Sequence, residues 1–275
     1  MLDAILLFRD ALYGALVIAL VCSALGVYVV LRRIVFVGAS LAQLSTLGIA
    51  ISFWLAGLGV GGIITSKPVF LSLFATLLGV VFFSTGMRRA RIPPDARIGV
   101  AYVVAGALAI LFIAKATVGE AHDIFLQGNI LGITRSDWLV LLGVSVPVLL
   151  VHALFYKEFL FISFDQETAR TLGYRVERWT LLLYLTLGLS IAFAMQFAGL
   201  MLVFDFLVLP AVTGLLMARG MGGVFTWGIG AGLAAAVIGF SISVPFDLPT
   251  GPAIVAVSGA LVILAWLTRR LRDVR

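Results

Sequence analysis

One carboxylate stands alone inside a long apolar run of this sequence. Asp205 lies in the stretch GLMLVFDFLVLPAVTG, and Pro210 follows five residues later. An ionisable side chain within a membrane span is costly and usually faces the interior of a helix bundle or an aqueous path. A proline frees a backbone carbonyl and weakens its helix locally. The pattern favours a helix that lines a path, with a purely structural hydrogen bond to a neighbouring helix as the alternative.

Polar side chains also gather in an earlier apolar run. The stretch VGASLAQLSTLGIAIS contains Ser40, Gln43, Ser45 and Thr46. Ser40 and Gln43 are three residues apart, so they share a helix face. Such side chains either join membrane helices through hydrogen bonds or contact a substrate, and the sequence leaves both interpretations open.

No catalytic set accompanies these residues. The sequence contains no phosphate-binding GxxxxGK[ST], no HExxH and no GxSxG motif. Its two histidines, His122 and His152, fall on different elements, and the single cysteine, Cys22, fits no disulfide or metal-ligand spacing. We therefore expect a chain that is not an enzyme and that holds no cofactor of its own.

The elements that position these residues are expected to be membrane helices. Of the 275 residues, 62% are hydrophobic and 12% are charged, whereas soluble domains carry roughly 25% charged residues. The apolar residues come in runs of about 20, the length that spans a bilayer as a helix. The sequence predicts an all-α, polytopic membrane bundle formed by one domain over residues 1–275.

Nine spans are predicted, with eight possible because the break at Gln196 to Gly199 is very short. They cover about 11–31, 38–58, 68–87, 98–116, 138–156, 179–197, 199–218, 222–244 and 250–268. Such a bundle is embedded in the lipid bilayer of a cell membrane.

Charge predicts the orientation of the bundle. The net charge is +6, and all but four of the 19 basic residues fall in connections that would share one side. The four exceptions are Arg9, Lys67, Lys115 and Arg135. Under the positive-inside rule, this asymmetry predicts a cytoplasmic C-terminus and an outer N-terminus. The rule also explains the positive charge better than a nucleic-acid partner would.

The inner connection at about 157–178 is predicted to contain a short helix. Ser163 and Gln166 have capping-box spacing, and Asp165 and Glu167 suit the first turn of a helix. Gly173 is a natural C-terminal stop. We expect a helix over roughly 164–172 at the cytoplasmic face.

Several motifs together resemble the permease subunits of zinc and manganese uptake ABC transporters. The matching segments, in chain order, are VLRRIVFVGASLAQLSTLGIAIS, LQGNILGIT, FLFISFDQETARTLGY, GLMLVFDFLVLPAVTGLLMARG and FDLPTGPAIVAVSGAL. The third resembles the family's cytoplasmic coupling segment. The resemblance implies that an ATPase is contacted by Phe164, Asp165, Glu167, Ala169, Leu172 and Gly173.

One departure from the family pattern concerns the metal ligands. Ala39 and Gln43 stand where the family has Asp and His, and Asp205 stands where the family usually has a small or apolar residue. A divalent cation needs ligands that replace its water, so Asp205, Gln43 and Ser40 are the candidate path-lining metal ligands. An oxygen-rich set favours a harder ion such as manganese over zinc.

The resemblance implies a permease subunit of an ATP-driven importer in the inner membrane of a bacterial-type cell. Its expected partners are a separate ATPase, a metal-delivering solute-binding protein and a second permease copy, and its cargo is a divalent metal ion. The rival hypothesis is a gradient-driven secondary transporter in which Asp205 is the coupling residue.

Overall fold

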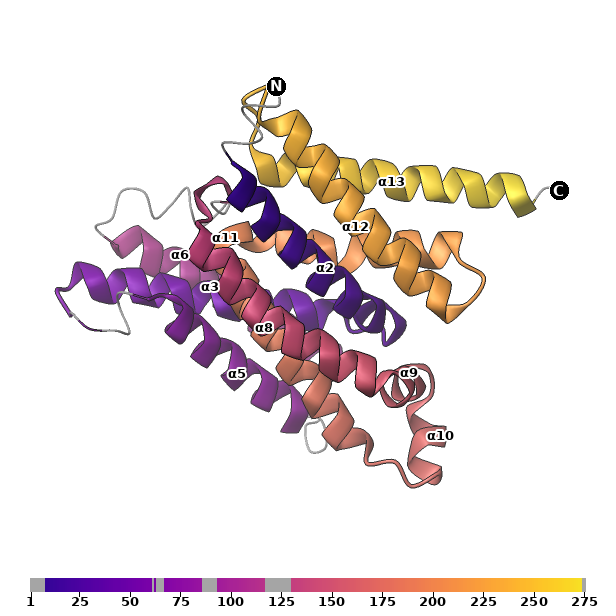
Figure 1. Ribbon diagram of the computed structural model, residues 1–275. Helices are drawn as coiled ribbons and strands as arrows, with labels where there is room; N and C mark the ends of the chain where they lie inside the picture. The colour runs from indigo at the N-terminus through magenta and orange to yellow at the C-terminus, as the bar shows by residue number, and fades with distance from the viewer. Residues whose placement is uncertain (1–7, 61, 63–66, 86–92, 117–129, 274–275) are drawn as a thin grey trace.

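All regular structure in the described part of the chain is helical (Figure 1). The computed structural model describes residues 8–60, 62, 67–85, 93–116 and 130–273. Its elements are α2 (Arg9–Leu31), α3 (Val35–Gly57), α5 (Val69–Thr85), α6 (Pro94–Lys115), the 3₁₀ turn η2 (Ile130–Gly132), α8 (Arg135–Leu154), α9 (Tyr156–Phe164), α10 (Gln166–Thr171), α11 (Val176–Met217), α12 (Met221–Ser243) and α13 (Thr250–Asp273).

Seven helices in the described ranges are long and apolar enough to cross a membrane. One of them is α11, which has 42 residues, about twice the length that one crossing needs. A further apolar helix, α5, has 17 residues. The predicted all-helical membrane fold is confirmed at this level.

The long helix α11 is interrupted at one residue. Gly199 has φ 72° and ψ 170°, outside the helical region. A residue with a side chain rarely adopts this positive φ, whereas glycine does so readily. The predicted break at Gln196 to Gly199 is therefore confirmed, and Pro210 lies within the helical part that follows it.

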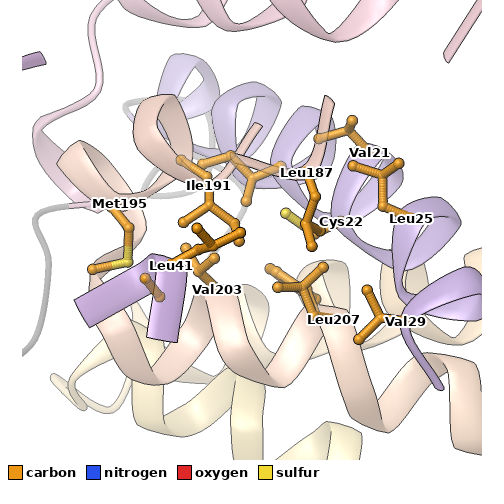
Figure 2. Close-up of a cluster of buried hydrophobic side chains, with 14 of the residues drawn as sticks. Val21, Cys22, Leu25, Val29, Leu41, Leu187, Ile191, Met195, Val203 and Leu207 are labelled. Atoms are coloured by element: carbon orange, nitrogen blue, oxygen red, sulfur yellow. The ribbon is translucent and has the colours of Figure 1, made fainter. Parts of the chain in front are cut away.

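The core forms where α2 and α3 meet both halves of α11. Figure 2 shows Cys22 and Leu25 of α2 gathered with Leu187 of the first half of α11 and Leu207 of the second half. All four side chains are fully or almost fully buried. Cys22 is thus a packing residue.

Small residues allow close approach of these helices. A Cβ atom on Gly26 of α2 would clash with the Leu207 carbonyl oxygen. On α12, a Cβ on Gly232 would clash with Ser23 Oγ, and one on Gly228 would lie 3.2 Å from the Pro210 carbonyl oxygen. The GxxxG pair of α12 therefore packs against α2 and α11, as small residues do in membrane bundles.

The inner connection forms two short helices instead of the single one predicted over 164–172. Ser163 is not a cap, because its hydroxyl lies inside α9 and donates to the Phe159 carbonyl at 2.6 Å. Asp165 is the N-cap of α10, and it accepts from the backbone N–H groups of Glu167 and Thr168. The aromatic segment before Phe164 extends as helix, which moves the start of the next helix two residues along the chain.

Candidate functional site

Asp205 is buried on the second half of α11. Its side chain is 2% exposed. Ser258 of α13 donates its hydroxyl to Asp205 Oδ2 at 2.8 Å. Within the described residues, the other carboxylate oxygen, Oδ1, has no hydrogen-bond partner. A buried acceptor without a partner is costly, so this oxygen is suited to bind something that the chain itself does not supply.

A cavity of about 510 Å³ lies beside this carboxylate. Asp205 lines it together with Ala39 of α3, Tyr102 of α6 and Val255 of α13. Four helices distant in sequence thus contribute to its wall. Ala39 stands where the resembled family has Asp, so the acidic group near this wall comes from α11 instead of α3.

The other two candidate ligands do not line this cavity. Gln43 lies one turn beyond Ala39 on the same face of α3, and its amide is within 3.5 Å of the Cβ position of Gly106 on α6. Ser40 is fully buried, and its hydroxyl has no partner among the described residues. The structure therefore brings Asp205 and Ala39 together, with Gln43 one turn away and Ser40 on the neighbouring position of α3.

The chemistry of this region is that of oxygen donors in an apolar wall. Among the described residues, no group of three or more His, Cys, Asp and Glu side chains comes together. The oxygen groups of this region include one carboxylate oxygen, unpartnered in the described part of the chain, and the Gln43 amide, which lies one helical turn from Ala39. Oxygen ligands of this kind suit manganese or magnesium better than zinc.

The segment between α9 and α11 is organised around Asp165. Its Oδ1 accepts from the backbone N–H of Glu167 at 3.0 Å and of Thr168 at 2.9 Å, and its Oδ2 accepts from Thr168 Oγ1 at 2.5 Å. The hydrogen bonds from the side chain and backbone of Thr168 lower the pKa of the exposed Asp165 carboxyl. The carboxylate therefore fixes the start of α10.

The remaining residues of this segment divide between two faces. Ala169 is completely buried, whereas Phe164 is 60% and Leu172 is 65% exposed, and Glu167 is also exposed. Gly173 has φ 85° and ends the segment as predicted. Since apolar side chains outside a membrane are normally covered, Phe164 and Leu172 form a surface suited to a partner protein.

A buried cluster surrounds His152, and no motif in the sequence indicated it. The His152 ring stacks on Phe159 of α9, with centroids 4.3 Å apart, and lies 5.0 Å from the Tyr28 ring of α2. Its Nε2 is 2.9 Å from Thr186 Oγ1 of α11. Phe159 also meets Trp179 of α11 edge-on at 5.5 Å. The cluster joins α9, which leads directly into α10, to three membrane helices.

The fold and these two regions define a membrane transport permease. A bundle of apolar helices contains a buried carboxylate beside a cavity. A short helical segment offers exposed apolar side chains outside the bundle. Residues 4–269 match the model of the ABC 3 transport family. The chain belongs to this family, and it is the permease part of an ABC transporter.

Two relatives support the assignment in sequence. The chain is 29% identical over 261 residues to the manganese transport system membrane protein MntC of Halalkalibacterium halodurans, covering 94% of this chain and 86% of the relative. It is 30% identical over 260 residues to the manganese import system permease protein ScaB of Streptococcus gordonii, covering 94% and 90%.

A solved structure supports the family assignment at the level of the fold. The chain superposes on a chain of PsaBC from Streptococcus pneumoniae, solved in complex with Fab, with a TM-score of 0.83 and 26% sequence identity. The match covers 96% of this chain and 94% of that one. The helical arrangement is therefore shared along nearly the whole length.

Proposed function

We propose that this chain forms the translocation path of a manganese(II) importer. The two relatives above bear names for manganese transport, and the charged ligand that the cavity offers is the oxygen of the Asp205 carboxylate. The observation that carries the proposal is the buried Asp205 carboxylate, which has one oxygen bonded to Ser258 and the other without a partner. Asp205 is proposed to bind the cation in transit, with Gln43 and Ser40 bordering the same route.

The ion enters and leaves in this proposal without complete removal of its water. A single carboxylate cannot satisfy the six oxygen ligands, or thereabouts, of a hard divalent cation. The remaining positions are filled by water, by the Gln43 amide and by a second copy of the permease. Weak and shared coordination suits a path, because binding must be favourable enough to enter and weak enough to leave.

The partners of the permease are proposed from the family and from the segment between α9 and α11. A separate ATPase docks on the surface formed by Phe164, Asp165, Glu167, Leu172 and Gly173, which is continuous with a cavity of about 500 Å³ lined by Leu172, Arg175 and Trp179. A solute-binding protein delivers the ion to the outer face, and two permease copies complete the path. Residues 1–275 act as one domain.

The membrane arrangement follows from the same features. Residues 176–198 and 200–217 of α11 cross the bilayer separately, and α5 also crosses, which gives nine crossings. The basic residues place the C-terminus in the cytoplasm and the N-terminus outside. The gradient-driven rival is not favoured, since the family match extends over residues 4–269.

The test is manganese uptake by cells that carry the permease with its ATPase and binding protein. Asp205→Asn keeps the shape and removes the charge, so we expect uptake to fall at least about tenfold, the consequence of losing a charged contact. Asp247→Asn is the matched control, because Asp247 is exposed between α12 and α13, and Asn tolerates its positive φ of 50°. Normal uptake by Asp205→Asn, at equal protein in the membrane, would disprove the role of Asp205.

A further inference from the structure

An apolar groove lies between the end of α11, α12 and α13, and Asp205 is not among its lining residues. Its volume is about 540 Å³. Gly230, Ala231 and Ala234 of α12 and Leu261, Leu264 and Ala265 of α13 form its wall. No atom lies within 4 Å of the Cβ position of Gly230. Since Gly230 is also exposed, the groove is open to the surroundings of the bundle and has room for a flexible apolar chain.

One end of the groove is polar and carries positive charge. Met217 and Thr268 line that end, and Thr268 Oγ1 lies 3.2 Å from Met217 Sδ. Arg219 follows Met217 by two residues, and Arg272 lies one helical turn beyond Thr268. Both arginine side chains are exposed. Neither arginine lines the groove itself, but each lies within one helical turn of a residue that lines this end.

Aromatic residues mark the same end as a membrane interface. Trp227 lines the groove and is half exposed. On α13, Trp266 is half exposed, and the Arg270 guanidinium lies over its ring at 5.4 Å. Tryptophan is enriched at the headgroup level of bilayers. From Thr226 to Ala234 the helix rises by roughly 12 Å, so the groove extends from this level into the hydrocarbon.

We propose that the groove is a binding site for an anionic phospholipid. One acyl chain lies against Gly230, Ala234 and Leu261, and the phosphate meets Arg219 and Arg272. Basic pockets between membrane helices on the cytoplasmic side recognise anionic headgroups through the same chemistry. The small side chains of α12 leave the space, and the two arginines select the charge.

A second copy of this chain fits the groove less well. A two-fold interface brings the same patch of both copies together. The arginines of both copies would then lie along the same edge of the interface, where like charges repel. An anionic lipid, by contrast, complements both the apolar wall and the positive end.

Native mass spectrometry of the purified transporter complex tests this proposal. The complex is extracted from nanodiscs that contain phosphatidylcholine with a minor fraction of phosphatidylglycerol, and retained lipids are identified. We expect phosphatidylglycerol to be retained in preference to phosphatidylcholine. Gly230→Leu fills the groove, and Arg219→Gln with Arg272→Gln removes two charges, so each change should lower retention by at least about tenfold.

Gly143→Leu is the matched control for the groove. Gly143 is an exposed glycine of α8 with no atom within 4 Å of its Cβ position, and this variant should retain lipid as the unaltered chain does. Equal retention of both lipids, or equal retention by all variants, would overturn the proposal. A loss of permease pairing in Gly230→Leu would also overturn it, by identifying the groove as an interface between copies.

Discussion

Ala39 of α3 and Asp205 of α11 line the same cavity. In the family that the sequence resembles, an acidic residue stands at the position of Ala39. We propose that α11 supplies through Asp205 the carboxylate that α3 supplies in the family, the alternative being that the substrate is not a zinc-like ion. Under this proposal, the chain departs from the family pattern in α3 and still offers an oxygen ligand to the cavity.

The relocation predicts that the two positions can exchange their roles. In the Asp205→Asn background, Ala39→Asp should restore a substantial part of manganese uptake, because it returns one carboxylate to the same cavity. Uptake of radioactive manganese by cells carrying all subunits measures this. Ala42→Asp on the same helix, at a fully buried position that does not line the cavity, should not restore uptake. If the Ala39→Asp, Asp205→Asn double variant is inserted normally but remains as inactive as the Ala42→Asp control, the prediction is wrong. The position of the carboxylate would then matter more than its presence in the cavity.

The end of the coupling segment predicts a backbone-specific effect. Gly173 has φ 85°, and no atom lies within 4 Å of its Cβ position, so only backbone strain opposes a side chain there. Gly173→Val should disfavour the docked conformation by about 1–2 kcal/mol, which corresponds to roughly a 5–30-fold loss of transport-linked ATP hydrolysis.

Gly173→Asn is the control for that experiment, since Asn adopts the left-handed region far more readily than a β-branched residue does. It should keep most of the coupled activity. Assembly of the bundle should be equal in both variants, because the site lies outside the membrane helices. Unchanged coupled hydrolysis in Gly173→Val would argue against docking at this segment.

The proposed orientation predicts the labelling of engineered cysteines in intact cells. The native Cys22 is fully buried and should not react with an impermeant thiol reagent. Ala96→Cys, at an exposed position near the start of α6, should be protected by the membrane. Val60→Cys, exposed after the end of α3, should react. The opposite pattern would reverse the topology.

The buried cluster predicts separate contributions from stacking and hydrogen bonding. His152→Ala removes a ring packed between Tyr28 and Phe159 and should destabilise the protein by about 2–4 kcal/mol. His152→Phe keeps the stacking and loses only the contact with Thr186, at a cost of about 1 kcal/mol. Thermal unfolding in detergent compares them, and equal losses would assign the effect to the hydrogen bond.

Hydropathy predicted the membrane helices because each crossing requires a run of apolar residues. The expected span 38–58 corresponds to α3, Val35–Gly57. The last helix was underestimated: the prediction ended at 268, whereas α13 continues to Asp273. The last residues of α13 are charged, so the apolar run ends before the helix does. Similarly, Ser163 has capping spacing, but whether α9 continues past it depends on how Phe159 and Ile162 pack, which spacing alone does not reveal.

The partners of Asp205 were beyond the reach of the sequence for a different reason. The run around Asp205 indicated a carboxylate within a helix, and the structure buries it. Ser258, which donates to it, lies on another helix and is one of many serines in apolar surroundings. Only the packing of α11 against α13 selects that serine. His152 is a similar case, because its neighbours come from α2, α9 and α11.

The interruption at Gly199 has a mechanical consequence for the whole chain. Thr186 and Trp179, which contact the His152 cluster, lie before Gly199, and Asp205 lies six residues after it. No loop separates the two arms of α11. The φ and ψ angles of Gly199 are therefore the main backbone freedom between the two arms. The two arms are thus two helices joined at a single non-helical residue. We therefore expect a displacement of α9, applied to the arm before Gly199, to shift the Asp205 carboxylate on the arm after it, because no loop lies between the two arms.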